Sequence, residues 1–348
     1  MNKRGAVRLA PAVLLSGVLI LAWMCSSALV SAQEAAVTAV NQRSQTEEGM
    51  TEAVSESLSE VPDETMSESV SEAQSETYTA QEQAADLQNK EILSMLCRDY
   101  LAAREAQGET WAVAVEDLAT GISGSYHGST SMQSASVIKV FIMGAVYERI
   151  VEPAEGMKAI AYTPAYDGEL SSLISQMITV SDNDAANRLI SILGGGDFAA
   201  GAAVVNDFCI RHGYPQTHVG RRFLESAPTD DNYTSADDCC RILSEIYNGT
   251  LVSEESSAMM LGYLKAQTRT GKIPAGLPSS MTSANKTGEM PDGYGLGCIE
   301  NDIAIIFSDT GDYVLCILSN NLGGRNSEAQ AVITQMSAAV AQQMSRKE

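Results

Sequence analysis

The sequence predicts an α+β domain in which one antiparallel sheet is flanked by the terminal helices and joined to a helical subdomain. Three observations predict this fold: an early pair of strands, a long helical block after it, and three later strands followed by a helix. Strands separated by such a block are buried together when the early pair joins the late strands in a single sheet. We therefore expect the terminal helices on one face of that sheet and the helical block on the other.

Residues 1–32 have the features of a segment that directs export. Three basic residues, the last of them Arg8, precede an uncharged and mostly apolar run, and small residues up to Ala32 resemble a signal-peptidase site. The run is long for a signal peptide, so an uncleaved membrane anchor is the alternative. In both cases the sequence predicts a protein that is secreted or tethered to the cell envelope, outside the cytoplasm.

Residues 33–90 are predicted to form a disordered tether. The segment is rich in Ser, Glu, Gln and Thr, carries repeats such as "SESLSE" and "SESVSE", and contains thirteen acidic and two basic residues. Such a composition buries too little apolar surface to offset the entropy of ordering. The folded domain is therefore placed at residues 91–348.

Periodicity and turn residues predict each element in chain order. Residues 83–107 carry apolar residues at helical spacing, and residues 111–128 alternate around a Gly-containing turn, as a β-hairpin does. An apolar helix begins near Ser136, and residues 168–250 are mainly helical with Gly and Pro breaks. The last predicted elements are strands at 281–290, 302–309 and 312–320 and a helix at 327–345.

Composition excludes several classes of function. The net charge of −22 argues against a nucleic-acid partner and does not suggest binding to anionic lipid. Six Cys follow the N-terminal segment, and export permits disulfides, but the spacing does not choose among the pairings. With no CxxC pattern, no Cys/His cluster and only three His, we expect no metal site and no cofactor.

A single charged residue interrupts the apolar helix. In "SASVIKVF", Ser136 and Lys139 stand three positions apart and therefore share one helix face. A lysine is costly to bury unless it is paired or loses its proton, and a lysine with a lowered pKa can activate a serine nucleophile. The alternative is that Ser136 caps the helix while Lys139 extends to solvent.

Two more short motifs carry polar side chains at the ends of predicted elements. Ser181-Asp182-Asn183 offers a hydroxyl to relay a proton and an amide to hold a substrate carbonyl, although Ser181 with Asp184 also fits a capping box. Lys286-Thr287-Gly288 lies at a strand edge and could bind a carboxylate, while Gly288 would let a ligand approach the backbone. The alternative for this motif is a surface strand with a Gly bulge.

The three motifs together indicate a family. Ser-x-x-Lys, then Ser-Asp-Asn, then Lys-Thr-Gly, with a helical block between them, is the motif set of class A β-lactamases and penicillin-binding proteins. From about residue 90 to its end, the chain resembles the class A β-lactamase-related serine hydrolases, and "MITVSDNDAANRLISILGG" looks like that family's segment throughout. The resemblance implies a β-lactamase/transpeptidase-like fold.

The resemblance also implies a role for each matching residue. Ser136 would be the acylated nucleophile, and Lys139 would take its proton directly or through water. Ser181 would pass a proton to the leaving nitrogen, with Lys286 keeping that hydroxyl polarised. The substrate would be held by Asn183 at its side-chain amide, by Thr287 at its carboxylate, beside Gly288, and by the backbone N–H groups of Ser136 and Glu289 at its oxyanion.

Two departures from the family's pattern bear on function. Class A β-lactamases carry Arg-x-Glu-x-x-x-Asn, whose Glu activates the deacylating water; counted from Arg222, the Glu and Asn positions hold Leu224 and Pro228. Glu225 stands one residue late, so it is a candidate base only if the loop differs in length, and otherwise a solvated carboxylate. In addition, the strand at 302–309 and its neighbours offer no obvious Arg to help hold a β-lactam carboxylate.

We therefore expect an exported serine hydrolase, acylated on Ser136, that hydrolyses β-lactam amide bonds with slow deacylation. The alternatives are a D-alanyl peptidase or esterase acting on cell-wall-type substrates, and a wall-binding homologue without turnover. Intact motifs argue against the last, because a pure binder has no need of a buried lysine. The expected partner is a small β-lactam or peptidoglycan-type molecule, and the expected state is a monomer.

Overall fold

The computed structural model describes residues 78–153, 159–161, 169–225, 229–291 and 298–346. The predicted export segment, the tether up to residue 77, and Pro228 lie outside the described residues.

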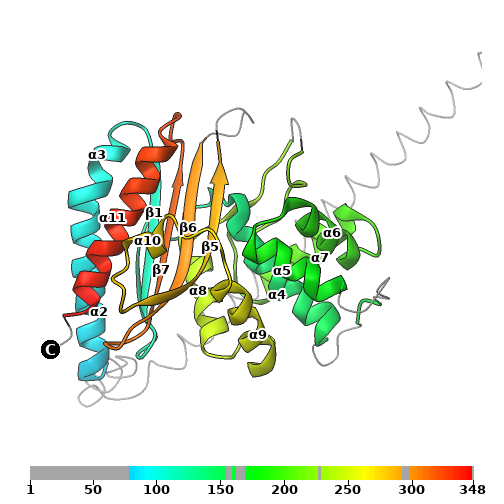
Figure 1. Ribbon diagram of the computed structural model, residues 1–348, viewed down its shortest axis with the longest axis horizontal. Coiled ribbons are helices and arrows are strands. Elements are labelled where there is room, and N and C mark those ends of the chain that lie inside the picture. Colours follow the sequence, from blue (N-terminus) through cyan, green and yellow to red (C-terminus); the bar gives the residue numbers. More distant parts are fainter. Residues whose placement is uncertain (1–77, 154–158, 162–168, 226–228, 292–297, 347–348) are drawn as a thin grey trace, which may run out of the picture. The chain divides into compact units, whose positions relative to one another are not determined.

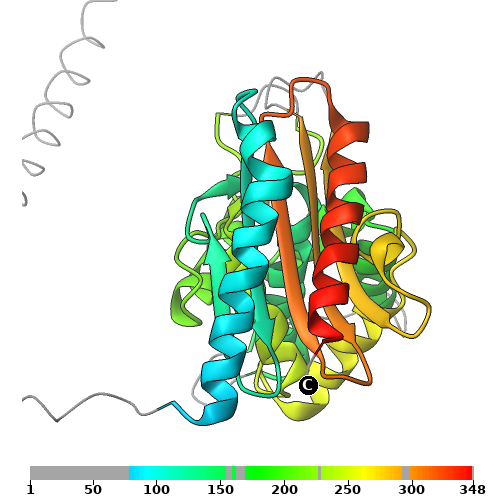
Figure 2. The same ribbon diagram turned by 90° about the vertical axis from the view of Figure 1, so that its left-hand side faces the viewer.

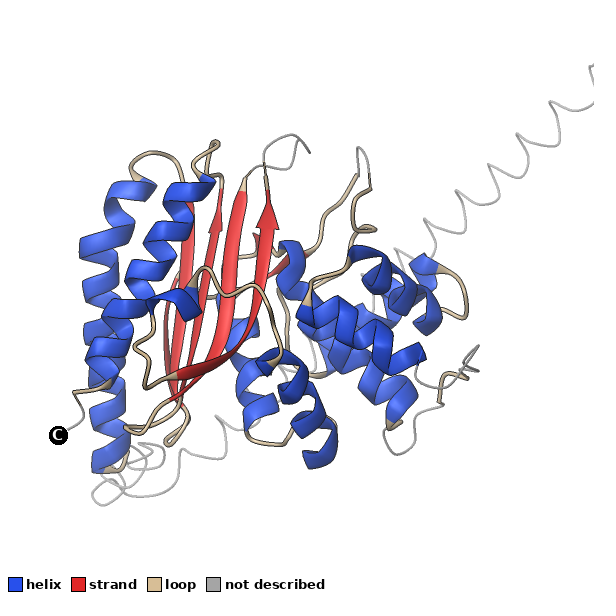
Figure 3. Cartoon of the chain, viewed as in Figure 1, coloured by secondary structure: helices blue, strands red, loops and turns tan. Residues whose placement is uncertain are grey.

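A five-stranded antiparallel sheet forms the centre of the domain (Figure 1, Figure 3). Its order is β2-β1-β7-β6-β5, so the early hairpin lies beside the last strand of the chain. This arrangement confirms the predicted α+β class and the single sheet that joins early and late strands. The strands are β1 (Thr110–Asp117), β2 (Ile122–Tyr126), β5 (Thr282–Met290), β6 (Ile299–Phe307) and β7 (Tyr313–Asn320).

The register of β1 divides its apolar side chains between the two faces of the sheet. Thr110 pairs with Asn320 at one end of the β1–β7 ladder, and Asp117 pairs with Tyr313 at the other. Because successive side chains of a strand point to opposite faces, Val113 joins the core under the terminal helices while Ala114 joins the core on the helical block. The sheet is therefore buried on both faces, and its edge strand β5 borders the helical block.

The terminal helices α2 (Ala80–Leu96) and α11 (Asn326–Met344) lie side by side on one face of the sheet (Figure 2). Ile92 and Ile333 are among the fully buried residues of that core. Helix α2 continues through a π-helical turn (Cys97–Leu101) into α3 (Ala102–Glu105). The predicted helix at 83–107 is thus present and begins three residues earlier than expected.

The start of α2 corrects the predicted boundary of the tether. Thr79 and Glu82 form a capping box, Ala85 is buried, and Asn89 donates a hydrogen bond from Nδ2 to the carbonyl oxygen of Ile122 at 2.9 Å. For the helical residues up to 90, the assignment to a disordered tether is therefore wrong. Composition misled here because a surface helix buries only a narrow stripe, and its exposed residues are as polar as those of a disordered segment.

The helical block packs against the other face of the sheet (Figure 1). Its central helix, α4 (Lys139–Val146), is buried along its whole length, as the apolar sequence predicts. The turns η2 (Ala135–Ile138, 3₁₀) and η3 (Tyr147–Val151, π) extend it at either end. The remaining helices are α5 (Glu169–Thr179), α6 (Asn183–Leu193), α7 (Phe198–Arg211), α8 (Ala236–Tyr247), α9 (Glu254–Lys265) and the short α10 (Ile273–Gly276).

A second, two-stranded sheet was not predicted from the sequence. β3 (Met132–Gln133) pairs with β4 (Tyr233–Thr234). These strands are two residues long, which is too short for alternation to reveal them. The pairing joins the segment that precedes Ser136 to the segment that follows the loop at Arg221, so it brings two parts of the candidate site together.

All six described cysteines are free thiols, and five of them are buried. In the ranges that the structure describes, no single helix is long and apolar enough to cross a membrane. Helices α6 and α7 pass that test only as a pair, and they are bent by 84° relative to each other.

Candidate active site

Ser136 lies in the 3₁₀ turn η2, which leads into the buried helix α4. The residue before the turn is held from two directions. Ser134 donates from its backbone N–H to the carbonyl oxygen of Asn232 at 2.9 Å, and Asn301 of strand β6 donates from Nδ2 to the carbonyl oxygen of Ser134 at 3.1 Å. Both sheets therefore fix the turn that carries the predicted nucleophile.

Strand β5 passes so close to this turn that a side chain at position 288 would collide with it. A Cβ on Gly288 would stand 2.7 Å from the carbonyl oxygen of Ser134 and 3.1 Å from the backbone nitrogen of Ser136. Because both are backbone atoms, neither can move aside cheaply. Gly288 thus makes room for the turn at Ser136, whereas the sequence interpretation reserved that room for a ligand.

The side chain of Lys139 is fully buried, so the alternative in which it extends to solvent is wrong. Its Nζ donates to the carbonyl oxygen of Ser181 at 2.7 Å and to Asn183 Oδ1 at 2.8 Å, and it lies 3.3 Å from Ser181 Oγ. Burial lowers the pKa of Lys139 to about 7; Asp182 opposes that shift and Arg269 adds to it. A substantial fraction of this amine is therefore uncharged at neutral pH.

Lys286 of strand β5 contacts the same hydroxyl from the other side. Its Nζ donates to Ser181 Oγ at 2.9 Å and to the carbonyl oxygen of Thr287 at 2.8 Å. Burial lowers the pKa of Lys286 well below its ordinary value, and the neighbouring Lys139 and Arg269 add to that shift. Two amines thus converge on one serine hydroxyl, which is the arrangement that a proton relay requires.

Ser181 does not cap the helix that follows it. The N-cap of α6 is Asp182, whose carboxylate accepts from the backbone N–H of Ala185 at 2.7 Å. Ser181 itself has φ of 63°, and Ala135 and Leu224 at the same site have φ of 45° and 61°. Residues other than Gly seldom adopt this left-handed conformation, and such residues cluster at functional sites.

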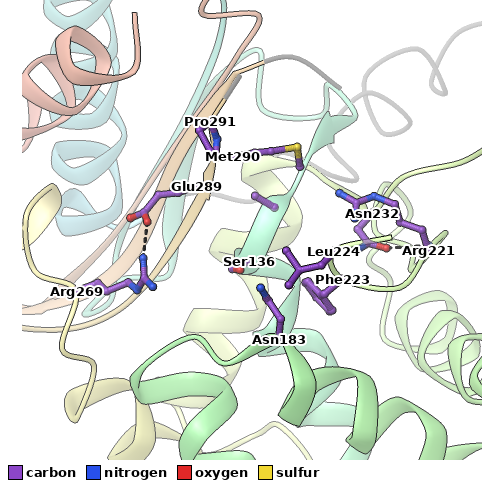
Figure 4. Close-up of a pocket in the computed structure, with 11 residues that line it drawn as sticks. Ser136, Asn183, Arg221, Phe223, Leu224, Asn232, Arg269, Glu289, Met290 and Pro291 are labelled. Carbon is purple, nitrogen blue, oxygen red and sulfur yellow. Dashed lines mark hydrogen bonds and ion pairs between the residues drawn. The ribbon is translucent and has the colours of Figure 1, made fainter. Parts of the chain in front are cut away.

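A pocket of about 270 Å³ opens in front of Ser136 (Figure 4). The structure brings three predicted site residues, Ser136, Asn183 and Glu289, to its wall. Lys139 and Lys286 both contact Ser181, and Lys139 is connected to that wall through its hydrogen bond to Asn183. Thr287 is buried in β5. The residues that line the pocket are Ala135, Ser136, Asn183, Arg221, Phe223, Leu224, Asn232, Arg269, Glu289, Met290 and Pro291.

The loop at Arg221 is anchored one residue earlier than the sequence interpretation assumed. Arg221 is buried, and its Nε donates to Asp231 Oδ1 at 2.6 Å. Two residues later, the ring of Phe223 lies over Lys139, with 4.6 Å between the ring centroid and Nζ. The side chain that the loop presents to Lys139 is therefore an aromatic ring.

The structure does not bring Glu225 into the pocket. Its side chain is exposed, and its Oε2 accepts from the backbone N–H of Arg222, within the loop, at 3.0 Å. Leu224 lines the pocket where the sequence interpretation counted the family's Glu position. A role for Glu225 as a deacylating base thus has no geometric support among the described residues.

Arg269 is a pocket residue that the sequence interpretation missed. It lies between helices α9 and α10, and its Nη1 donates to Glu289 Oε2 at 2.6 Å (Figure 4). The late strands carry no Arg that could serve here, and only the path of the chain shows that the "QTRTGK" segment borders the pocket. Within the described ranges, no three His, Cys, Asp or Glu side chains gather to form a metal site.

The chain is similar in sequence to known beta-lactamases. The sequence model of the "Beta-lactamase enzyme family" matches residues 93–344. A curated relative, beta-lactamase FAR-1 of Nocardia farcinica (strain IFM 10152), is 24% identical over 263 residues, which cover 70% of this chain and 80% of the relative.

Two solved structures share the fold. The ancestral (GNCA) class A beta-lactamase has a TM-score of 0.60 at 25% identity and covers 72% of this chain and 99% of its own. A point mutant of PBP-A, solved as an acyl-enzyme complex with penicillin G, has a TM-score of 0.59 at 22% identity. The match covers 75% of this chain and 97% of the PBP-A chain.

Proposed function

The chain belongs to the beta-lactamase enzyme family, and from that premise we propose that it is an exported serine hydrolase that opens β-lactam amide bonds by acylation of Ser136. The observation that carries the proposal is the convergence of two buried lysines, Lys139 and Lys286, on the hydroxyl of Ser181. Burying two amines costs free energy. A homologue that only binds wall material would gain nothing in return.

In the acylation step, Ser136 Oγ attacks the amide carbonyl carbon while the neutral amine of Lys139 takes the hydroxyl proton. The two N–H bonds of the neutral amine can donate to Ser181 and Asn183, which leaves the lone pair of Nζ to accept the proton of Ser136 directly or through a water molecule. The carbon–nitrogen bond then breaks, and the leaving nitrogen receives a proton through Ser181 Oγ. Lys286, 2.9 Å from that oxygen, keeps the hydroxyl oriented.

The oxyanion formed during the attack would accept hydrogen bonds from the backbone N–H groups of Ser136 and Glu289. The close approach at Gly288 supports this assignment, since it holds the two backbone segments together. Asn183 lines the pocket and would hold the side-chain amide of the substrate. Thr287 and the guanidinium of Arg269 would receive the substrate carboxylate, and Arg269 would thus fill the role for which the late strands offered no obvious Arg.

Slow deacylation is the second part of the proposal. A water molecule that attacks the acyl-enzyme needs a base, and the loop presents the Phe223 ring to Lys139, with Leu224 on the pocket wall. The carboxylate of Glu225 is directed to its own loop. A neighbour in fold, the PBP-A point mutant, has been obtained as an acyl-enzyme with penicillin G.

The apolar side chains of Phe223 and Leu224 favour a second candidate function, a D-alanyl peptidase or esterase acting on peptidoglycan-type substrates. Such an enzyme would deacylate by a route that needs no carboxylate at the position that Phe223 occupies. Export through residues 1–32 and tethering through the following segment would place either activity outside the cytoplasm, where these substrates occur. A monomer is sufficient for both activities, because every residue assigned a role belongs to one chain.

The experiment that tests the proposal is covalent labelling with a fluorescent penicillin. The wild-type protein should acquire one label on Ser136, and Ser136→Ala should acquire none while keeping its circular dichroism spectrum. Ser172→Ala, which changes an exposed serine of α5, is the matched control and should label as the wild type does. Equal labelling of Ser136→Ala and the wild type would refute the assignment of the nucleophile.

A further inference from the structure

We propose that Glu289 is a specificity-determining residue, which weakens binding of substrates that carry a free carboxylate and favours those whose corresponding group is uncharged, such as an ester or an amide. The inference rests on the proposed function, because it concerns the substrate of the Ser136 site. It assigns a role to the side chain of Glu289, whereas the mechanism above uses only the backbone N–H of that residue.

The first observation is the position of the Glu289 carboxylate. Thr287 and Glu289 are two residues apart on strand β5, so their side chains point to the same face. The carboxylate of Glu289 therefore lies beside the place where Thr287 would hold a substrate carboxylate. Both Glu289 and Arg269 belong to the pocket wall (Figure 4).

The second observation is that Glu289 already neutralises the cation at this place. Its Oε2 accepts from Arg269 Nη1 at 2.6 Å, and its Oε1 lies 3.2 Å from Lys272 Nζ. Burial raises the pKa of Glu289, but Lys272 and Arg269 together outweigh burial and hold that pKa below its ordinary value. Glu289 is therefore negatively charged at neutral pH.

The third observation is that neighbouring cations are occupied by other partners. Of the two guanidinium groups on the described pocket wall, Arg221 donates to Asp231 at 2.6 Å and to the carbonyl oxygen of Arg222 at 3.0 Å. Lys272 is buried and donates to Glu300 at 2.8 Å. A substrate carboxylate must therefore share Arg269 with Glu289.

Sharing Arg269 with Glu289 is electrostatically unfavourable for a substrate carboxylate. Two carboxylates on one guanidinium repel each other, and a partly buried site screens that repulsion less than water does. An ester or amide at the same place carries no charge and avoids the repulsion. Specificity of this kind arises from an unfavourable contact with one class of ligand. The opposite role predicts the opposite result. If Glu289 oriented Arg269 toward a substrate carboxylate, removing the charge of Glu289 would weaken binding of that substrate.

The test compares the second-order rate constant for acylation of Ser136 by a β-lactam that carries its free carboxylate with that by its methyl ester. Glu289→Gln keeps the shape and the backbone N–H of the residue and removes the charge. We expect this variant to raise the ratio of the rate constant for the carboxylate form to that for the ester by about tenfold relative to the wild type. Glu255→Gln, an exposed residue of α9, is the matched control and should change neither rate constant.

The outcomes are distinguishable from failure of the proposed function. Suppose that both compounds acylate the wild type, but that Glu289→Gln leaves the ratio of the carboxylate-form rate constant to the ester rate constant unchanged or lowers it. The inference about Glu289 is then wrong, while the assignment of Ser136 as the nucleophile is kept. If neither compound acylates Ser136, the proposed function fails and the inference fails with it. Circular dichroism of Glu289→Gln must match the wild type, and Glu289→Ser provides a second neutral variant with the same expected sign.

Discussion

Lys139 donates a hydrogen bond from its buried Nζ to the carbonyl oxygen of Ser181 at 2.7 Å. A carbonyl oxygen accepts a hydrogen bond from a neutral amine as well as a stronger one from an ammonium, so this contact does not require Lys139 to be charged. The position of the side chain is therefore compatible with both protonation states. Burial then decides between them, by lowering the pKa to about 7.

The rate of acylation should rise with pH through neutrality. A pKa lowered to about 7 means that Lys139 is protonated below that pH and neutral above it, and only the neutral amine can take the proton of Ser136. Below pH 6 the rate constant for labelling by a fluorescent penicillin should fall by about tenfold per pH unit, and above pH 8 it should level off. The measurement is this rate constant between pH 5 and pH 9, with circular dichroism at each pH as the control. A rate that is flat over this range would contradict the role of Lys139 as the base.

The N-terminal boundary of the folded domain gives a second prediction. A shortened chain that begins at Tyr78 retains the whole of α2 and should unfold at the same temperature as the full chain. A chain that begins at Glu91 loses the buried Ala85 and the hydrogen bond of Asn89 to the carbonyl oxygen of Ile122, so its midpoint should fall by several degrees. Thermal unfolding followed by circular dichroism compares the two chains. Equal midpoints would show that residues 78–90 contribute nothing to the domain.

The sequence was sufficient for the fold because its elements are long and strongly patterned. The hairpin at 111–128 alternates with a period of two, whereas β6, β7 and the buried helix after Ser136 are largely apolar runs. Each lies within a few residues of its predicted position, and β6 begins at Ile299 instead of 302. The single antiparallel sheet followed from grouping the early and late strands, whereas the order of its strands was not predicted. The central residues of the site were found for a related reason, since Ser136, Ser181 and Lys286 belong to short motifs whose order is informative.

The residues that sequence analysis missed act through contacts that have no local pattern. Arg269 reaches the pocket because the chain between α9 and α10 passes the edge strand, and nothing in "QTRTGK" indicates that. The loop was misaligned because two arginines are adjacent, and only the ion pair with Asp231 identifies Arg221 as the anchor. The positions of Arg269 and Arg221 in the site are therefore evident only from their tertiary contacts.

That anchor places Phe223, rather than Leu224, beside Lys139. The ring centroid of Phe223 is 4.6 Å from Nζ, and the backbone of the loop at this point is held by a hydrogen bond from Phe223 N to Asn187 Oδ1 at 3.0 Å. A carboxylate carried on the same Cβ would therefore approach Lys139 from a fixed position. Glu225, whose side chain turns back to the N–H of Arg222, has no comparable approach.

The last prediction is that Phe223→Glu accelerates deacylation, whereas Glu225→Gln changes it little. Rapid mixing of the wild type with a chromogenic β-lactam should show a burst near one equivalent of enzyme and then a slow steady state, with mass spectrometry finding the adduct on Ser136. A positioned base contributes about 10²–10⁴-fold to such a step, so Phe223→Glu should raise the steady-state rate by at least about tenfold, provided that the new carboxylate is ionised beside Lys139. Phe223→Gln is the matched control, because it is polar and of the same length as Glu but cannot act as a base. Glu225→Gln should alter the slow phase by less than about tenfold. Fast turnover of the wild type without a burst, together with trapping of the adduct in Glu225→Gln, would show instead that Glu225 is the base and that the loop moves to place it over the ester.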